Sequence, residues 1–194
     1  MNYLAHAYLS FQHPEILVGN MISDYVKGKK KFEYSPGIQK GIALHRAIDT
    51  FTDAHAVTKQ AKEIFRPVYR LYSGAFIDVV YDHFLATDET IFTNASLNSF
   101  AQATYRMLEE YVSVFPEKFA SMFPYMKEQN WLYNYKETWG IQKSLAGVVR
   151  RSTYLTESET AYQLFIENYD ALKVQYNLFF PALLVHTKEV YNSL

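Results

Sequence analysis

The spacing of apolar residues along the chain predicts helices and almost no strands. Apolar positions recur three and four residues apart, and only 7 Gly and 6 Pro are present to punctuate strands and hairpins. Start and stop signals favour helices over residues 14–27, 36–53, 56–66, 75–86, 94–111, 138–151 and 157–194. We therefore predict an all-α fold, a single helical domain over residues 1–194, with breaks or kinks at Pro67, Pro116, Pro124 and Pro181.

Composition narrows the classes of function. The 17 Tyr and 14 Phe predict a core dominated by aromatic packing. A net charge of -1 provides no overall field that would attract nucleic acid or an anionic membrane, so neither is an expected partner. The chain has no Cys, which excludes disulfides, thiolate ligands and cysteine nucleophiles. Any metal chemistry must therefore use oxygen and imidazole ligands.

Neither end of the chain suggests a membrane or secretory segment. The first ten residues contain no basic segment and do not resemble a secretory signal. The longest apolar run near the other end, residues 178–185, is too short to span a bilayer. We expect a cytoplasmic protein, and the sequence makes no prediction of its oligomeric state.

Three polar residues interrupt the apolar segment 75–86. On a helical wheel this segment is apolar on every side except at Asp78, Asp82 and His83, and a helix that is apolar all round is normally buried. Asp78 and Asp82 are four residues apart and share a face. Because buried carboxylates stay ionised only beside a cation or a metal ion, this segment predicts part of a cation site.

The segment 41–53 repeats this arrangement. His45 and Asp49 share one helical face, and Asp53 continues it one turn on. Ile42 and Ile48 flank the polar stripe, so we expect it to be set into the packed surface and to face the first cluster.

Asp24 adds another acid among apolar neighbours, and Arg46 is the only cation within these segments. A bound divalent cation would balance the excess of carboxylates. Oxygen-rich ligation with one or two imidazoles favours Mn²⁺ or Mg²⁺, with Zn²⁺ or Fe²⁺ less favoured. The competing interpretation is that these residues are helix caps, ion-paired acids and hydrogen-bonded core histidines.

Other polar residues are less specific. We interpret His6 either as a core histidine or as a residue that contacts the metal ligands without binding the metal itself. Lys27, Lys29, Lys30 and Lys31 closely follow Asp24 and form either a docking patch for an acidic partner or a solvated loop. The arginines at 66, 70, 150 and 151 could extend that patch or bind a phosphate.

Four sequence blocks keep the order and spacing of a known family. They are MNYLAH at 1–6, GNMISDYVKG at 19–28, HRAID with the following TD at 45–53, and DVVYDHFL at 78–85; residues 131–132 and 150–151 are weaker matches. In these blocks the chain resembles the acyl carrier protein phosphodiesterases, also called acyl carrier protein hydrolyases. The resemblance implies an all-helical variant of the HD phosphohydrolase fold that depends on a divalent metal, usually Mn²⁺.

The resemblance also implies an activity, the hydrolytic removal of 4′-phosphopantetheine from holo acyl carrier protein to give the apo form. The matching positions are Asp24, His45, Asp49, Asp53, Asp78, Asp82 and His83. One departure is that Asp82 precedes His83, whereas a standard HD motif runs His-Asp.

Within that set we expect His45, Asp49, Asp82 and His83 at or beside the metal, and Asp24 as a ligand or a base that orients water. Asp53 and Asp78 are further catalytic candidates, and Arg46 is a candidate to hold the phosphate. Such a site supports metal-assisted hydrolysis. Because acyl carrier proteins are small and acidic, the four lysines at 27–31 are candidates for docking them.

Two other functions stay open at this point. One is an HD-like metal phosphohydrolase acting on a nucleotide or another small phosphoester. The other is a non-catalytic helical module that binds an acyl carrier protein. The sequence contains no Walker phosphate loop, dinucleotide fingerprint or nucleophile elbow.

Overall fold

The computed structural model describes all 194 residues as helices joined by short connections, with no β-strand. The all-α prediction is confirmed. The α-helices are α1 (Tyr3–Tyr8), α2 (Pro14–Ile22), α3 (Pro36–Ala54), α4 (Ala56–Tyr69), α5 (Ser73–Ala86), α6 (Asn94–Glu109), α7 (Glu117–Glu128), α8 (Trp131–Asn134), α9 (Thr138–Arg151), α10 (Glu159–Glu167) and α11 (Tyr169–Ser193). Four 3₁₀ segments accompany them: η1 (Ser23–Tyr25), η2 (Gly28–Glu33), η3 (Arg70–Tyr72) and η4 (Val112–Val114).

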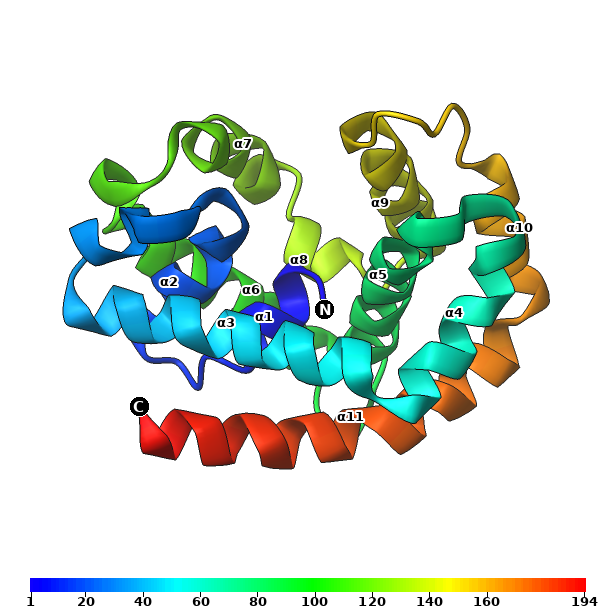
Figure 1. Cartoon of the computed structure of the whole chain (residues 1–194), viewed down its shortest axis with the longest axis horizontal. Helices are drawn as coiled ribbons and strands as arrows, with labels where there is room; N and C mark the ends of the chain where they lie inside the picture. The colour runs from blue at the N-terminus through cyan, green and yellow to red at the C-terminus, as the bar shows by residue number, and fades with distance from the viewer.

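The long helices α3 and α11 run side by side along one edge of the molecule (Figure 1). At one end α2 packs on α3, and at the other end α5 contacts α4 and α9. The short helix α1 contacts both α2 and α5 and lies between the two ends. One apolar core runs through the whole arrangement and is rich in aromatic side chains, as the composition predicted. None of the helices combines the length and the apolar character needed to cross a membrane.

Three prolines lie inside helices that they were expected to break or kink. Each of them is exposed, and so is the residue four positions earlier, as holds for Pro67 with Glu63, Pro124 with Ala120 and Pro181 with Asn177. Water can therefore satisfy the carbonyl that proline leaves without a donor. Buried neighbours such as Phe179 and Leu183 keep α11 continuous across its proline.

The first predicted helix stops earlier than expected, at Ile22 rather than near Lys27. The chain tightens into η1 and then turns at Gly28, whose φ of 60° lies in the left-handed region that glycine tolerates. This early stop places Asp24 in a 3₁₀ turn at the end of α2.

Helices α2 and α3 cross at two glycines. A Cβ built on Gly19 would lie 2.0 Å from the carbonyl oxygen of Ile38 and 2.8 Å from the Cα of Gly41. A Cβ on Gly41 would lie 2.3 Å from the carbonyl oxygen of Ile16. The two main chains touch because neither residue has a side chain. This contact brings the polar residues just beyond it, Asn20 on α2 and His45 on α3, within hydrogen-bond distance.

Candidate metal site

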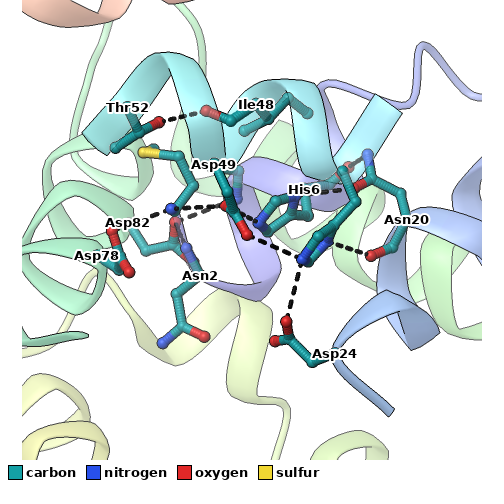
Figure 2. Close-up of polar contacts among 12 residues, drawn as sticks. Asn2, His6, Asn20, Asp24, Ile48, Asp49, Thr52, Asp78 and Asp82 are labelled. Atoms are coloured by element: carbon teal, nitrogen blue, oxygen red, sulfur yellow. Dashed lines mark hydrogen bonds and ion pairs between the residues drawn. The ribbon is translucent and has the colours of Figure 1, made fainter. Parts of the chain in front are cut away.

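His6, His45 and Asp49 place one ligand atom each within 4.8 Å of one another. Helix α1 supplies His6, and α3 supplies the other two residues one turn apart. Nε2 of His6 lies 3.3 Å from Oδ1 of Asp49, and Nε2 of His45 lies 3.0 Å from Oδ2 of the same carboxylate. The two imidazole rings stack with their centroids 4.0 Å apart. Figure 2 shows Asp49 reaching down from α3 toward His6.

Asn20 orients both imidazoles. Its side-chain oxygen accepts a hydrogen bond from Nδ1 of His6, and its main-chain oxygen accepts one from Nδ1 of His45, each at 2.7 Å. The side-chain amide of Asn20 in turn donates to the main-chain oxygen of His6 and to the hydroxyl of Ser10. Because both acceptors of Asn20 require a donor, both histidines carry a proton on Nδ1, which is the arrangement that turns Nε2 toward a metal ion.

This arrangement fits a divalent cation. In the neutral histidines the two Nε2 atoms present lone pairs, and they face the oxygens of one carboxylate. Nε2 of His6 is buried and has no hydrogen-bond partner. Lone pairs that converge on a carboxylate repel unless a proton or a cation lies between them, and two imidazoles with a carboxylate form a common ligand set for divalent metals.

Without a cation, protons distribute unevenly over the cluster. Burial lowers the pKa of His6 to about 4, and the charge of His45 adds to this effect. Burial also disfavours the charged form of His45, but hydrogen bonds to Asp24 and Asp49 outweigh it and raise the pKa to about 9. For Asp49, burial is likewise outweighed by the two histidines, so its pKa lies well below the usual range. One proton, on His45, therefore occupies the position that a cation would take.

Asp24 completes the cluster from the solvent side. Its Oδ1 lies 3.2 Å from Nε2 of His45, and its side chain is 68% exposed. The hydrogen bond to His45 holds its pKa below the usual value. In Figure 2 Asp24 lies below the cluster, on the side opposite to Ile48. The structure thus brings together Asp24, His45 and Asp49 from the sequence-based set, and adds His6.

Asp82 has a different position from the one expected. Its carboxyl group is fully buried and accepts hydrogen bonds from the main-chain amides of Asn2, Leu4 and Ala5, at 3.3, 2.7 and 3.2 Å. These are the unpaired amides at the start of α1, which favour a carboxylate, but burial outweighs them and raises the pKa of Asp82 to about 7. The structure therefore places Asp82 at the start of α1, the helix that carries His6, and not among the clustered ligand atoms.

His83 also lies away from the cluster. Its Nδ1 bonds to the carbonyl oxygen of Tyr135 at 2.8 Å, and its Nε2 bonds to the hydroxyl of Tyr169 at 3.0 Å. Burial lowers its pKa. Both ring nitrogens have partners, so this histidine ties α5 to α11 and to the chain after α8 and is not brought to the cluster.

The other candidates surround the cluster without entering it. Asp78 binds the amino group of Met1 at 3.0 Å, and that amino group also lies 3.5 Å from Asp49. Asp53 is exposed and pairs with Lys62 at 2.6 Å. The side chain of Arg46 is exposed and donates from Nη2 to the carbonyl oxygen of Val26 at 3.3 Å. Asp53 therefore takes part in an ion pair with Lys62, and Arg46 donates a hydrogen bond to Val26. Neither residue lies at the cluster.

Sequence reasoning missed the positions of His6 and Asn20. His6 was interpreted as core or supporting, yet its Nε2 is one of the three clustered ligand atoms. Asn20 was not singled out at all. One signal was available in the sequence: Asn20 is a polar residue within the otherwise apolar run 16–22. The structure buries this whole run, Asn20 included.

Comparison with known proteins gives one consistent result. The family model described as acyl carrier protein phosphodiesterase matches residues 1–183. An acyl carrier protein phosphodiesterase from Klebsiella pneumoniae is 32% identical over 95% of this chain and 96% of its own. Those from Photorhabdus laumondii and Yersinia pestis are 30% and 31% identical, again over 95% of this chain and over 93% and 96% of theirs. No solved structure matches the chain.

Proposed function

Because the chain belongs to the acyl carrier protein phosphodiesterase family, we propose that it hydrolyses the phosphodiester that joins 4′-phosphopantetheine to holo acyl carrier protein. The observation that carries the proposal is the cluster of His6, His45 and Asp49, with both imidazoles oriented by Asn20. We assign a divalent cation to these three residues, and Mn²⁺ suits the mixed imidazole and carboxylate set. A divalent cation held there would supply positive charge to the phosphoryl oxygens and would lower the pKa of water.

The chain's own residues divide the remaining tasks. Asn20 holds both imidazoles in one tautomer through its two acceptors. Asp49, whose oxygens lie beside the two Nε2 atoms, would balance the charge of a bound cation. Asp24 is exposed at the open side of the cluster, so its second oxygen is available to accept a proton from an attacking water. Asp78, held beside Asp49 by the amino group of Met1, contributes negative charge at the edge of the site.

The lysines that follow Asp24 provide a docking surface for an acidic protein. Lys27, Lys29 and Lys30 are exposed and Lys31 is half-buried, and none of the four forms an ion pair. The patch begins three residues after Asp24, so a partner that binds it lies beside the cluster. Its charge complements that of an acidic carrier protein.

The test is to incubate the purified protein with holo acyl carrier protein and Mn²⁺ and to follow the carrier by mass spectrometry. We expect the mass to fall by that of the phosphopantetheine group. Asp49→Asn should reduce the rate by about 10²-fold or more, because a ligand is lost. Asp170→Asn on the exposed face of α11 is the matched control and should retain the rate.

Two results would contradict the proposal. Failure to release the group with any divalent metal would reject the reaction. Hydrolysis of nucleotides or other small phosphoesters at rates equal to that on the carrier protein would instead indicate a general phosphohydrolase. Charge reversal at Lys29 and Lys30 should raise KM for the carrier protein and leave small-substrate hydrolysis unchanged.

A further inference from the structure

The turn between α4 and α5 carries an exposed apolar side chain. Leu71 of η3 is 98% exposed, the largest fraction among the large apolar residues of the chain, and Val68 near the end of α4 is 48% exposed. Figure 1 shows this turn linking the upper ends of α4 and α5. Single exposed apolar residues are common on protein surfaces, so the meaning of Leu71 depends on its surroundings.

The backbone that presents Leu71 is strained. Arg70, the residue before it, has a φ of 48° and a ψ of -118°, a region where residues other than glycine are disfavoured. This conformation leaves Leu71 in water, whereas Tyr69 is buried and Tyr72 is half-buried. Strained positions persist where the surrounding structure imposes them, and they cluster at sites that bind ligands and partners. The turn therefore has the character of a contact surface.

A groove connects this turn to the metal cluster. It has a volume of about 680 Å³, and both Leu71 and Asp78 line it. Asp78 binds the amino group of Met1, which also lies 3.5 Å from Asp49 of the cluster. Ser73, the first residue of α5, precedes Asp78 by five positions, a rise of about 8 Å along the helix. A partner that covers Leu71 therefore also reaches the edge of the cluster.

The charge of the groove suits an acidic partner. Its lining contains three cations, Lys62, Arg66 and Arg70, and two acids, Asp53 and Asp78. Lys62 pairs with Asp53, and Arg66 pairs with a glutamate one turn earlier on its own helix. Arg70 forms no ion pair. An uncompensated cation beside an exposed leucine matches a partner surface that places a carboxylate next to an apolar depression.

The turn and the four lysines at 27–31 approach the cluster from different directions. The lysines follow Asp24, and the groove reaches Asp78. Figure 2 shows Asp24 and Asp78 on different sides of Asp49. A protein substrate whose phosphodiester lies over the cluster can therefore contact both surfaces at once.

We propose that Leu71 and Arg70 form a second docking surface for the acidic carrier protein. Leu71 enters an apolar depression of the partner, and Arg70 pairs with one of its carboxylates. The identity of the partner rests on the proposed function, and the inference adds which surface of this chain the partner covers beyond the lysines.

The test measures binding without turnover. Apo acyl carrier protein, the expected product, is titrated into the protein in EDTA and followed by calorimetry. We expect Leu71→Ser to weaken binding by about 10–100-fold, the factor for burying one leucine side chain. Leu178→Ser is the matched control, because Leu178 on α11 is 63% exposed and does not line the groove, and it should bind like the parent.

A charge variant tests the second contact. Arg70→Gln should weaken binding by about threefold at low salt, and the difference should disappear at about 0.5 M salt, because ions screen exposed charges. Arg106→Gln, at an exposed arginine of α6 without an ion pair, is its control and should bind like the parent. Unchanged far-ultraviolet circular dichroism would show that the variants are folded.

Three results would overturn the inference: no binding of apo carrier protein by the parent, parent affinity in Leu71→Ser, or an equal loss in Leu178→Ser. Sedimentation with phosphatidylglycerol vesicles is measured alongside. Sedimentation that depends on Leu71, without binding of the carrier protein, would also overturn it and assign the turn to a membrane surface.

The outcome is separable from the proposed function because the titration needs no hydrolysis. Hydrolysis of holo carrier protein by Leu71→Ser at unchanged KM would reject the docking surface and leave the activity in place. Binding that depends on Leu71, without hydrolysis under any metal, would do the reverse.

Discussion

The Cα atoms of Gly19 and Gly41 lie where α2 and α3 touch, so close that a Cβ on either glycine would overlap the other helix. The residues that follow depend on this contact. Asn20 comes directly after Gly19, and His45 lies one turn beyond Gly41, which brings the Asn20 carbonyl and the His45 ring within 2.7 Å. A crossing made of main-chain atoms is therefore what determines the tautomer of a candidate ligand.

Gly41→Ala tests this relationship. The added methyl would lie 2.3 Å from the carbonyl oxygen of Ile16, so the helices must separate. We expect a loss of about 1–3 kcal/mol in the free energy of unfolding, measured by urea denaturation, because overpacking outweighs the helical preference of alanine. Gly74→Ala is the control, since its Cβ would meet only the flexible end of Lys62 at 3.4 Å, and it should be neutral or stabilising. Equal stability of the two variants would contradict the prediction.

Asp82→Asn separates an anchoring role from a ligand role. Asparagine keeps the size of the side chain but presents one acceptor and a donor to three main-chain amides of α1. We expect a loss of about 1–3 kcal/mol in the free energy of unfolding, because a buried donor is left unpaired. If Asp82 were instead a metal ligand, the variant would keep the stability of the metal-free protein and lose only metal binding. Urea denaturation in EDTA distinguishes the two outcomes when the pH is well above 7, because burial raises the pKa of Asp82 to about 7 and only the ionised form lacks a donor.

Much of the fold follows from apolar spacing alone. The predicted range 138–151 coincides with α9, and 36–53 differs from α3 by one residue. Apolar spacing does not reveal how main-chain hydrogen-bonding groups are paired where a helix ends or contains a proline. The early stop at Ile22 depends on the 3₁₀ turn η1, and the unbroken helix through Pro181 depends on an exposed carbonyl and on the packing of Phe179.

The site was accessible to sequence reasoning only in part. His45 and Asp49 are four residues apart on one helix, so their proximity follows from helical geometry. Asp82 shows the same local pattern, an acid in an apolar helix, yet its partners are amides at residues 2, 4 and 5. A metal ion and the start of another helix both satisfy a buried carboxylate, and the choice depends on contacts about 80 positions away in the chain.

Asn20→Ala tests whether the side chain of Asn20 orients the imidazole of His6. The substitution removes the acceptor for Nδ1 of His6, while the main-chain acceptor for His45 remains. We expect Mn²⁺ affinity to fall by about 10–100-fold, the usual effect of removing a group that orients a ligand. Affinity can be measured by electron paramagnetic resonance of free Mn²⁺. Asn177→Ala, at an exposed position on α11, should bind like the parent, and an equal loss in both variants would contradict the assignment.

Metal binding should also release a proton. Burial alone would lower the pKa of His45, but Asp24 and Asp49 raise it to about 9, so at pH 7 its Nε2 carries a proton that a cation must displace. His6 is already neutral there, because burial lowers its pKa to about 4. Displacement of a single proton makes the Mn²⁺ affinity rise about tenfold per pH unit up to about pH 9, above which the dependence flattens. Calorimetric titration at pH 7 in two buffers of different ionisation enthalpy should give one proton released per ion. A heat of binding independent of the buffer would place the cation elsewhere than between His45 and Asp49.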